Sequence, residues 1–427
     1  MTIEALHQLF LTSNGLSTDT RSVQSGDLFF ALKGENFNGN TFAHQALKKG
    51  ASYAVIDELQ DSNCDQFILV KNVLATLQEL ANFHRTHLNI PIIALTGSNG
   101  KTTTKELIHS VLSQKYNTRA TKGNLNNHIG VPLTLLQMSQ ATELGIVEMG
   151  ANHIGEIAEL CRIAQPNYGY ITNFGKAHLE GFGGEEGVIK GKSELYDSIK
   201  KNDGIVIVNS DDPKQIAQLG GYENCIGFSE GSGSEYQIEL VSKEPFLKVK
   251  FMGHLIETQL IGAYNFSNIA AAITLGQCFE VDPITIKKGI ESYRPENNRS
   301  QIIKQNNNTI ILDAYNANPS SMVEALKTFN GMHGDNKVVV LGDMFELGEY
   351  SDLEHKSVIE LTLSFNFSKA IFVGSHFFNH APNYPNEHFF KTTNEVKNNL
   401  QQEKIADSFV LIKGSRGMAL EDVIQYL

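Results

Sequence analysis

The residues best suited to chemistry form a glycine-rich segment that reads Thr-Gly-Ser-Asn-Gly-Lys-Thr-Thr from Thr96 to Thr103. The segment follows an apolar strand pattern at 92–95 and opens a helical pattern. Glycines let backbone amides approach phosphate oxygens closely, and a helix N-terminus adds N–H donors. In such a loop Lys101 can reach the terminal phosphates and Thr102 can ligate Mg²⁺. The flanking strand and helix disfavour an ordinary capped turn. The segment therefore predicts a nucleotide-phosphate site formed by Gly97, Ser98, Asn99, Gly100, Lys101, Thr102 and Thr103.

Two further strand ends carry side chains that suit a divalent cation. The strand pattern at 144–147 delivers Glu148 to its carboxyl end, and the pattern at 168–171 is followed by a polar stretch that contains His178. A lone acid or histidine in a loop is usually just exposed to solvent. Ligands of parallel α/β sheets bind beyond the carboxyl ends of the strands, however, and carboxylate oxygens suit Mg²⁺. We therefore expect Glu148 to ligate Mg²⁺ together with Thr102.

Two asparagines at a second helix start offer a place for a nucleotide base. Asn265 and Asn268 lie one turn apart, so both amides can face one ligand. An amide carries both a donor and an acceptor, which suits the edge of adenine. The alternative is that Asn265 simply caps the helix.

The bulk properties of the chain exclude several classes of protein. A length of 427 residues exceeds one ordinary core, so two or three domains are expected. A net charge of -12 argues against a nucleic-acid-binding protein. The four widely spaced cysteines indicate free thiols in a reducing cytosol. The first residues do not resemble a signal peptide and no apolar run could span a bilayer. We therefore expect a cytoplasmic protein without membrane insertion.

Strand and helix patterns divide the chain into three blocks, at 1–86, 87–294 and 295–427. The first mixes short strands with one helical stretch, and the second carries the glycine-rich segment in an α/β pattern. A period-two run at 246–251 indicates antiparallel strands inside the second block. The fold class predicted is therefore α/β with several domains.

The third block repeats one pattern, in which a short apolar run ends in a polar residue. Asp313, Asp343, Ser375 and Lys413 stand at these ends. Strands that alternate with helices predict a doubly wound parallel sheet, whose strand ends share one edge. The four residues should then lie near one another, although turn formation is the alternative for each and the preferred reading for Ser375.

The central signatures resemble those of the Mur ligase family. An ordinary Walker loop has glycine where this chain has Leu95, and the short loop that results is typical of Mur ligases and folylpolyglutamate synthetases. The stretch 172–179 is similar to the family signature Thr-Asn-x-x-x-x-His-Leu, and 192–194 is similar to its Lys-x-Glu segment. The resemblance covers nearly the whole chain. It implies a small N-terminal α/β domain, a central P-loop-type parallel sheet with an ATP site, and a Rossmann-like C-terminal domain.

The resemblance also implies ATP, two Mg²⁺ ions and a carbamylated lysine. Lys192 matches that lysine because Glu194 then falls in the expected position, although Lys190 is a nearby alternative. His178 would ligate the second Mg²⁺, and Asn173 would line the site. The catalytic residues implied are Lys101, Lys192, His178 and Arg299.

Further residues receive nucleotide or substrate roles from the same resemblance. Arg299 would contact the γ-phosphate, Asp313 the ribose, and Asn316 and Asn318 would lie beside the nucleotide. The adenine would lie at Asn265 and Asn268. The UDP-sugar substrate would contact Asn126 and Asn127.

The two ends of the chain resemble one branch of the family, the ligases that add D-alanyl-D-alanine. Residues 17–35 are similar to its uridine-binding domain, which implies substrate contacts from Ser17, Asp19 and Arg21. Asn38 and Asn40 depart from the family, which often has Asp and His there. The motifs at 341–348 and 413–416 imply that the incoming dipeptide is held by Asp343, Lys413, Ser415 and Arg416.

We therefore expect an ATP-dependent, ADP-forming ligase that works as a monomer in peptidoglycan precursor synthesis. Its substrates would be UDP-muramoyl-tripeptide and D-Ala-D-Ala, joined through an acyl phosphate. The alternatives are another Mur or folylpolyglutamate-type ligase, or a nucleotide-binding module without catalysis. The lack of an Asp-Asn-Pro-Arg motif argues against the diaminopimelate-adding branch. The joint presence of Lys101, Thr102, Glu148, His178 and Lys192 argues against the module.

Overall fold

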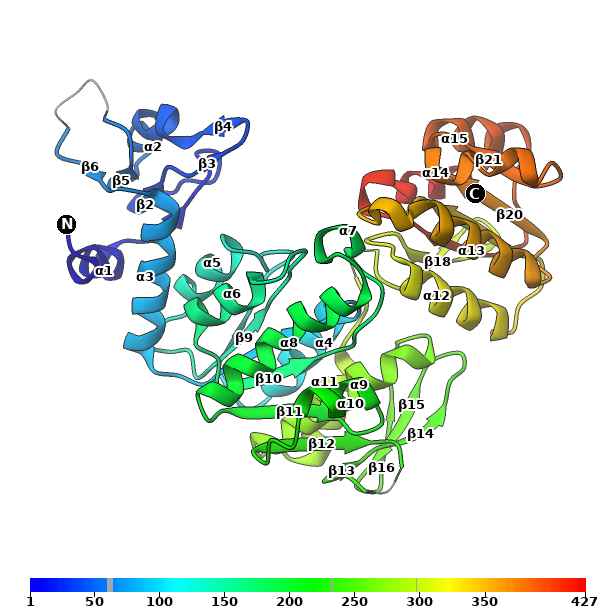
Figure 1. Cartoon of the computed structure of the whole chain (residues 1–427), viewed down its shortest axis with the longest axis horizontal. Coiled ribbons are helices and arrows are strands. Elements are labelled where there is room, and N and C mark those ends of the chain that lie inside the picture. The colour runs from blue at the N-terminus through cyan, green and yellow to red at the C-terminus, as the bar shows by residue number, and fades with distance from the viewer. Residues whose placement is uncertain (60–63, 232, 297) are drawn as a thin grey trace.

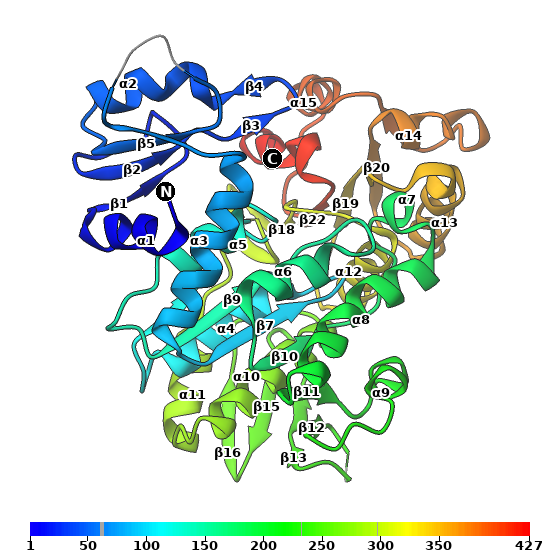
Figure 2. The same ribbon diagram turned by 60° about the vertical axis from the view of Figure 1, so that its left-hand side comes forward.

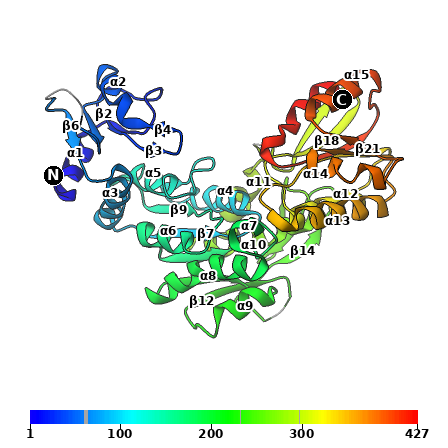
Figure 3. The ribbon, with the colours of Figure 1, turned by 45° about the horizontal axis from the view of Figure 1, so that its top comes forward.

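The computed structural model describes residues 1–59, 64–231, 233–296 and 298–427. Three larger sheets of four, seven and six strands follow one another along the chain. The blue N-terminal part and the orange-to-red C-terminal part lie on opposite sides of the green middle part (Figure 1 and Figure 3). This arrangement confirms the α/β class. The boundaries at 86 and 294 stay a proposal, and a helix at Val73–Leu88 crosses the first of them.

The N-terminal unit is built on a parallel sheet in the order β1-β2-β5-β6. Its elements are α1 (Ile3–Thr12), β1 (Gly15–Ser17), β2 (Asp27–Phe30), β3 (Lys33–Gly34), β4 (Phe37–Asn38), η1 (Gly39–Phe42), α2 (Ala43–Lys48), β5 (Tyr53–Ile56), β6 (Phe67–Leu69) and α3 (Val73–Leu88). Asn72 caps α3 by accepting from the Ala75 N–H at 2.8 Å. The Arg85 side chain of α3 donates to the carbonyls of Ala164 and Gln165, which ties this unit to the middle one.

The middle unit is a seven-stranded parallel sheet in the order β13-β12-β11-β10-β7-β9-β8. Its strands are β7 (Ile92–Thr96), β8 (Thr118–Ala120), β9 (Leu144–Glu148), β10 (Tyr168–Ile171), β11 (Ile205–Asn209), β12 (Cys225–Ser229) and β13 (Tyr236–Gln237). Its helices are α4 (Lys101–Leu112), α5 (Gly130–Leu136), α6 (Glu156–Ala164), α7 (Leu179–Phe182), α8 (Glu185–Lys201), α9 (Pro213–Leu219), η2 (Ala263–Asn265), α10 (Phe266–Cys278) and α11 (Pro283–Ser292).

Helices cover both faces of this sheet because its strands are apolar on both sides. Along β7, Ile92 and Ala94 belong to the core beneath α6 and α8, while Ile93 and Leu95 belong to the core beneath α4 and α10. Figure 2 shows α6 and α8 in front of the sheet. The expected antiparallel strands are also present, as a separate sheet of β14 (Glu239–Ser242), β15 (Lys248–Phe251) and β16 (His254–Glu257).

The C-terminal unit is a six-stranded sheet in the order β17-β18-β22-β19-β20-β21, antiparallel at β17–β18 and parallel elsewhere. Its strands are β17 (Gln301–Gln305), β18 (Asn308–Asp313), β19 (Lys337–Gly342), β20 (Lys369–Val373), β21 (His388–Phe390) and β22 (Phe409–Lys413). Its helices are α12 (Pro319–Gly331), η3 (Gly348–Tyr350), α13 (Ser351–Ser364), α14 (Ser375–Phe378), η4 (Ala381–Asn383), α15 (Thr393–Gln402), η5 (Arg416–Met418) and η6 (Leu420–Tyr426). All four strands expected in this block are confirmed.

Among the described residues, no helix combines the length and apolar character needed to span a membrane.

Candidate active site

A cavity of about 860 Å³ lies between the middle and C-terminal units. It is lined by the carboxyl ends of strands from both sheets, as the strand-end argument predicts. The residues singled out from the sequence that line it are Ser98, Asn99, Gly100, Lys101, Thr102, Thr103, Asn126, Asn127, Glu148, Asn173, His178, Asn265, Asn268, Arg299, Asp313, Asn316, Asn318 and Lys413.

The glycine-rich loop connects β7 to α4, and two of its glycines are required by geometry. Gly97 has a φ of 140°, and a Cβ there would stand 2.0 Å from the Thr172 hydroxyl. Gly100 has a φ of 81°, and a Cβ there would stand 2.6 Å from the Asn268 side-chain oxygen. The loop can therefore keep its tight path only if neither position carries a side chain.

The Lys101 ammonium lies over this loop. It donates to the carbonyl of Gly97 at 2.6 Å and, more weakly, to that of Ser98 at 3.3 Å. Burial lowers the pKa of Lys101, while Glu148 raises it and Arg299 lowers it further. A cation enclosed with few anionic partners is well prepared to bind an incoming phosphate.

Glu148 ends β9 next to the start of α4. One carboxylate oxygen accepts from Thr102 Oγ1 at 3.3 Å and from Asn126 Nδ2 at 2.8 Å. The other, Oε2, is buried and has no hydrogen-bond partner within the described ranges. A buried carboxylate oxygen without a partner, beside a hydroxyl, matches the oxygen ligands that Mg²⁺ prefers. These residues therefore fit the expected cation, although no described group of three His, Cys, Asp or Glu residues could hold a metal by itself.

Of the two residues expected at the second cation, only His178 is among the residues that line the cavity. His178 lines the cavity, and its Nδ1 contacts the carboxylate of Glu346 from the C-terminal unit. Lys192 is fully buried, its Nζ donating to the Ala151 carbonyl at 2.9 Å and lying 4.9 Å from the centre of the Phe182 ring. Burial holds the pKa of Lys192 well below its usual range, and Lys101 lowers it further. Lys190, the alternative in register, is exposed.

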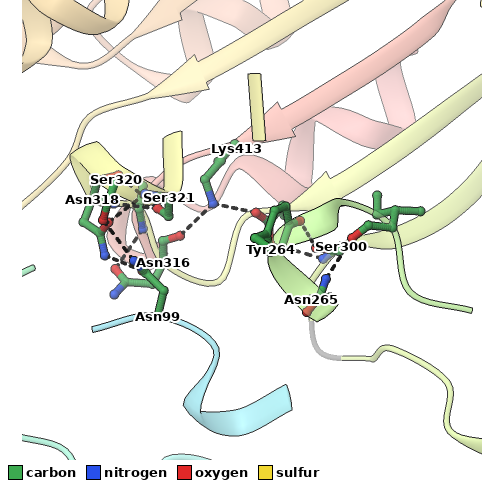
Figure 4. Close-up of polar contacts among 12 residues, drawn as sticks. Asn99, Tyr264, Asn265, Ser300, Asn316, Asn318, Ser320, Ser321 and Lys413 are labelled. Atoms are coloured by element: carbon green, nitrogen blue, oxygen red, sulfur yellow. Dashed lines mark hydrogen bonds and ion pairs between the residues drawn. The ribbon is translucent and has the colours of Figure 1, made fainter. Parts of the chain in front are cut away.

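The C-terminal wall pairs two neighbouring strand ends. Asp313 on β18 lies opposite Lys413 on β22, and the two side chains form an ion pair at 2.5 Å. Asp313 also accepts from the Ser300 N–H at 3.1 Å. The Arg299 guanidinium lies 3.7 Å from the centre of the Tyr315 ring, a cation–π contact that orients it. Figure 4 shows Lys413 and Ser300 of this wall together with Asn99 of the glycine-rich loop.

The two asparagines expected at the adenine are buried and bonded to the protein. The Asn268 amide donates to the Asn265 side-chain oxygen at 2.7 Å, and Asn265 donates to the Ile261 carbonyl at 2.8 Å. Thr104 Oγ1 donates to the Asn268 oxygen at 2.9 Å. Asn265 stands at the N-cap position of α10, as the helix-cap alternative predicts, but its side chain makes no capping bond.

Several residues with expected substrate roles lie outside the cavity lining. Asp343 is buried, and its two oxygens accept from the N–H groups of His376 and Phe377, so it fixes the turn after β20. Ser415 accepts from the Phe345 N–H, and Arg416 pairs with Glu421. The structure thus gives Asp343 and Ser415 supporting contacts in place of free side chains.

The expected N-terminal contacts also lie outside this cavity. Ser17 donates to the Asp19 carbonyl, and Arg21 forms an ion pair with Asp19 at 2.6 Å. Asn38 and Asn40, the two positions that depart from the family, bond to each other. The Asn40 Nδ2 donates to Asn38 Oδ1 at 2.9 Å and to Oδ1 of Asp57, directly after β5, at 2.8 Å. Asn40 is therefore a structural bridge in this chain.

Asn127 lines the cavity, but its side-chain oxygen accepts hydrogen bonds from the N–H groups at the start of α5.

The sequence did not single out some residues that the cavity brings in. Tyr264 lines it and bonds Ser300 across the two units at 3.1 Å. Ser320 lines it at the start of α12, and Glu346 reaches His178. The signal for Ser320 was its place in a helix start after a strand-end motif. No sequence signal pairs Tyr264 or Glu346 with their distant partners.

Comparison with known proteins agrees with this geometry. Three family models match successive parts of the chain: "Mur ligase family, catalytic domain" at 12–93, "Mur ligase middle domain" at 95–276 and "Mur ligase, glutamate ligase domain" at 298–416. The UDP-N-acetylmuramoyl-tripeptide--D-alanyl-D-alanine ligase of Bacillus subtilis is 35% identical, with 97% of this chain and 93% of the relative covered.

Solved structures give the same result. MurF from Acinetobacter baumannii superposes with a TM-score of 0.88 at 31% identity, covering 99% of this chain and 97% of that one. MurF from Thermotoga maritima, in complex with ADP, superposes with a TM-score of 0.83 at 26% identity, covering 98% and 97%. The chain belongs to the Mur ligase family.

Proposed function

We propose that this chain is an ATP-dependent, ADP-forming ligase that joins D-alanyl-D-alanine to UDP-N-acetylmuramoyl-tripeptide. The observation that carries the proposal is the buried Oε2 of Glu148, without a partner in the described residues, beside Thr102 and Lys101 in a cavity shared by two units. The names of relatives that align over nearly the whole chain support these substrates. A cytoplasmic location stays a prediction from the cysteine pattern.

The first step makes an acyl phosphate. An oxygen of the tripeptide's terminal carboxylate attacks the γ-phosphorus of ATP, the bond from that phosphorus to the β-phosphate oxygen breaks, and ADP leaves. Lys101 exchanges its carbonyl partners for phosphate oxygens, and Arg299, lining the same cavity, stabilises the charge on the transferring group. Backbone N–H groups of the loop hold the phosphates in line.

The second step forms the amide. The amine nitrogen of D-Ala-D-Ala attacks the acyl carbon, the bond from that carbon to the phosphate oxygen breaks, and the nitrogen loses a proton as phosphate leaves. The acyl phosphate would be lost to water in an open site. Contact between the middle and C-terminal units around the cavity protects it.

Residues on the middle unit would hold two Mg²⁺ ions. Thr102 and Glu148 supply oxygen ligands for one, and His178 and Lys192, as its carbamate, would serve the other. Bound Mg²⁺ neutralises phosphate charge and polarises the γ-phosphoryl group. The burial of Lys192 Nζ, which lowers its pKa and so favours the neutral amine, supports carbamylation, in which the amine adds CO₂ and releases a proton. A ¹³C-bicarbonate label that gives no carbamate signal in wild type, or an equal signal in Lys192→Ala, would remove Lys192 from this role.

The incoming dipeptide is assigned to the C-terminal strand ends near Lys413. Because Lys413 pairs with Asp313, the expected ribose contact, its substitution distinguishes two roles. We expect Lys413→Ala to raise the KM for the dipeptide more than the KM for ATP. The reverse order would assign Lys413 to the nucleotide.

The activity is tested by phosphate release from purified protein with ATP and UDP-muramoyl-tripeptide. Parallel reactions receive D-Ala-D-Ala, D-alanine, L-lysine or diaminopimelate, and UDP-muramoyl-tripeptides ending in lysine and in diaminopimelate are compared. We expect release with D-Ala-D-Ala and a product whose mass is the sum of both substrates less one water. Faster release with a single amino acid would favour another Mur ligase, and no release with any amine would favour a non-catalytic module.

A further inference from the structure

The side chain of Asn99 points out of the glycine-rich loop and into the C-terminal unit (Figure 4). Its oxygen accepts from Asn318 Nδ2 at 2.7 Å, and its Nδ2 donates to Ser320 Oγ at 3.0 Å. Both partners belong to the start of α12, more than two hundred residues further along the chain. The Asn99 side-chain amide therefore both donates and accepts a hydrogen bond across the interface between the middle and C-terminal units.

The backbone of Asn99 is held just as firmly by the middle unit. Its N–H donates to Asn173 Oδ1 at 3.1 Å. Its carbonyl accepts from Thr172 Oγ1 at 2.6 Å and from Asn173 Nδ2 at 3.0 Å. Gly175 completes the packing, since a Cβ there would stand 2.5 Å from Ser320 Oγ and 2.9 Å from Asn99 Nδ2. The loop thus has one anchor in each unit at the residue before Gly100.

Asn318 is oriented in advance for this contact. It is the N-cap of α12, and its Oδ1 accepts from Ser321 N–H and from Ser320 Oγ, both at 2.9 Å. Its own N–H donates to Ser321 Oγ at 3.1 Å, which completes a capping box. Because the helix uses the amide oxygen, the NH₂ group is left to face Asn99. Because the helix cap already fixes the Asn318 side chain, its NH₂ group loses no further conformational entropy when the two units meet.

We propose that Asn318 and Ser320 are positioning residues which shape the phosphate loop through Asn99, so that docking of the C-terminal unit and nucleotide binding favour each other. Asn99 is followed directly by Gly100 and Lys101, so its two hydrogen bonds fix the segment that presents N–H donors and the ammonium to phosphate. A bond made only in the docked arrangement couples the two events, and the coupling is reciprocal. This inference rests on the proposed function only in taking a nucleotide as the ligand.

The first test is a double-mutant cycle read by the dissociation constant of ADP with Mg²⁺, measured by calorimetry without turnover. Asn99→Ala removes the amide on one side. Asn318→Ser removes the donor on the other, while serine can still cap α12. Two neutral hydrogen bonds correspond to about tenfold in affinity. We expect Asn99→Ala, which loses both bonds, to weaken ADP binding about tenfold, and Asn318→Ser, which loses one, to weaken it about threefold. The double variant should bind no more weakly than Asn99→Ala alone.

A matched control uses the same substitution at another helix start. Asn72 caps α3 in the N-terminal unit and has no contact with the loop. We expect Asn72→Ser to bind ADP as wild type does. Ser320→Ala, which leaves the cap intact, should weaken ADP binding about threefold and should not lower the melting temperature.

A second readout follows the docking itself. Small-angle scattering should show that ADP makes wild type and Asn72→Ser more compact and leaves Asn318→Ser and Asn99→Ala extended. The inference is overturned if the effects of Asn99→Ala and Asn318→Ser multiply to about thirtyfold in the double variant, or if ADP affinity is unchanged in both. Wild-type protein that fails to bind ADP would instead refute the proposed function.

Discussion

The phosphate loop and the N-terminal loop with Ser17, Asp19 and Arg21 were both expected to bind substrate, yet their side chains behave differently. Asn99 bonds Asn318 and Ser320, in another unit. In the N-terminal loop, Arg21 bonds Asp19 two residues away, and Ser17 bonds the Asp19 carbonyl. The first region is shaped by contacts between units. The second is shaped locally: Ser17 is buried, while the Arg21 side chain projects outward, where a separate ligand has to supply its remaining partners.

The largest loss of activity is expected from a substitution in the phosphate loop. Lys101→Ala removes the ammonium that neutralises phosphate charge, so phosphate release in the complete reaction should fall about 10²- to 10³-fold. Lys122→Ala is the control, because Lys122 is exposed and lines no part of this cavity. Full activity in the Lys101 variant would mean that the loop does not hold the nucleotide.

A smaller effect is expected where the C-terminal unit touches a proposed metal ligand. The Glu346 carboxylate contacts His178 Nδ1, an arrangement that leaves Nε2 free for a cation. Glu346→Ala should weaken Mn²⁺ binding in the presence of ADP roughly tenfold, as outer contacts of ligating histidines do. Electron paramagnetic resonance of free Mn²⁺ measures this. Glu346→Gln, which keeps an acceptor oxygen, should restore most of it, and exposed Glu349→Ala should have no effect.

A moderate, pH-dependent effect is expected where the N-terminal unit meets the middle one. His7 is buried, and its Nε2 forms a hydrogen bond with His84 Nδ1 at 3.0 Å. Burial lowers the pKa of His7 to about 4, and the neighbouring His84 and His87 contribute to this shift. The unfolded chain therefore binds more protons than the folded one between the ordinary histidine pKa and about 4. Stability should fall as pH drops through that window.

Calorimetry at pH 7 and pH 5 tests this point. His7→Gln keeps a hydrogen-bonding side chain without titrating, so it should lose less of its melting temperature than wild type on acidification. Equal losses in the two proteins would show that the His7 site does not set the acid sensitivity of this junction.

The smallest structural effect is expected in the N-terminal loop. The Arg21 side chain is 88% exposed and pairs with a neighbour that is itself part-exposed, so Arg21→Ala should leave the melting temperature and the KM for ATP unchanged. If this loop contacts the UDP substrate, the KM for UDP-muramoyl-tripeptide should rise severalfold. An unchanged KM for that substrate would remove Arg21 from the site, and an altered KM for ATP would break the contrast between the two regions.

The sequence predicted the α/β class, the strands of the third block and a glycine-rich turn between a strand and a helix at Gly97–Gly100, because these depend on local periodicity and turn chemistry. The helix α4 starts at Lys101, so Lys101, Thr102 and Thr103 lie in its first turn. The sequence also predicted that Glu148 follows a strand end. It placed Asp313 and Lys413 at one sheet edge but did not predict their ion pair, which exists because β22, the last strand in the chain, inserts between β18 and β19. Strand order is a long-range property that no local pattern reports.

The same limit explains the residues whose surroundings differ from expectation. Asp343 does end a strand, but the adjacent turn after β20 surrounds it with N–H donors, so its carboxylate is used within the fold. The partners of Asn99 lie on α12, and those of His178 lie after β19. Sequence reasoning identified many of the side chains at the cavity and could not say which would bond to which.

The most direct test of the whole account is a crystal structure with Mg²⁺ replaced by Mn²⁺ and a non-hydrolysable ATP analogue. We expect the β- and γ-phosphates against the N–H groups of residues 97–102, Lys101 Nζ moved from the Gly97 carbonyl to phosphate oxygens, and an anomalous Mn²⁺ peak at Glu148 Oε2 and Thr102 Oγ1. Phosphates bound elsewhere, or Mn²⁺ remote from Glu148, would contradict it.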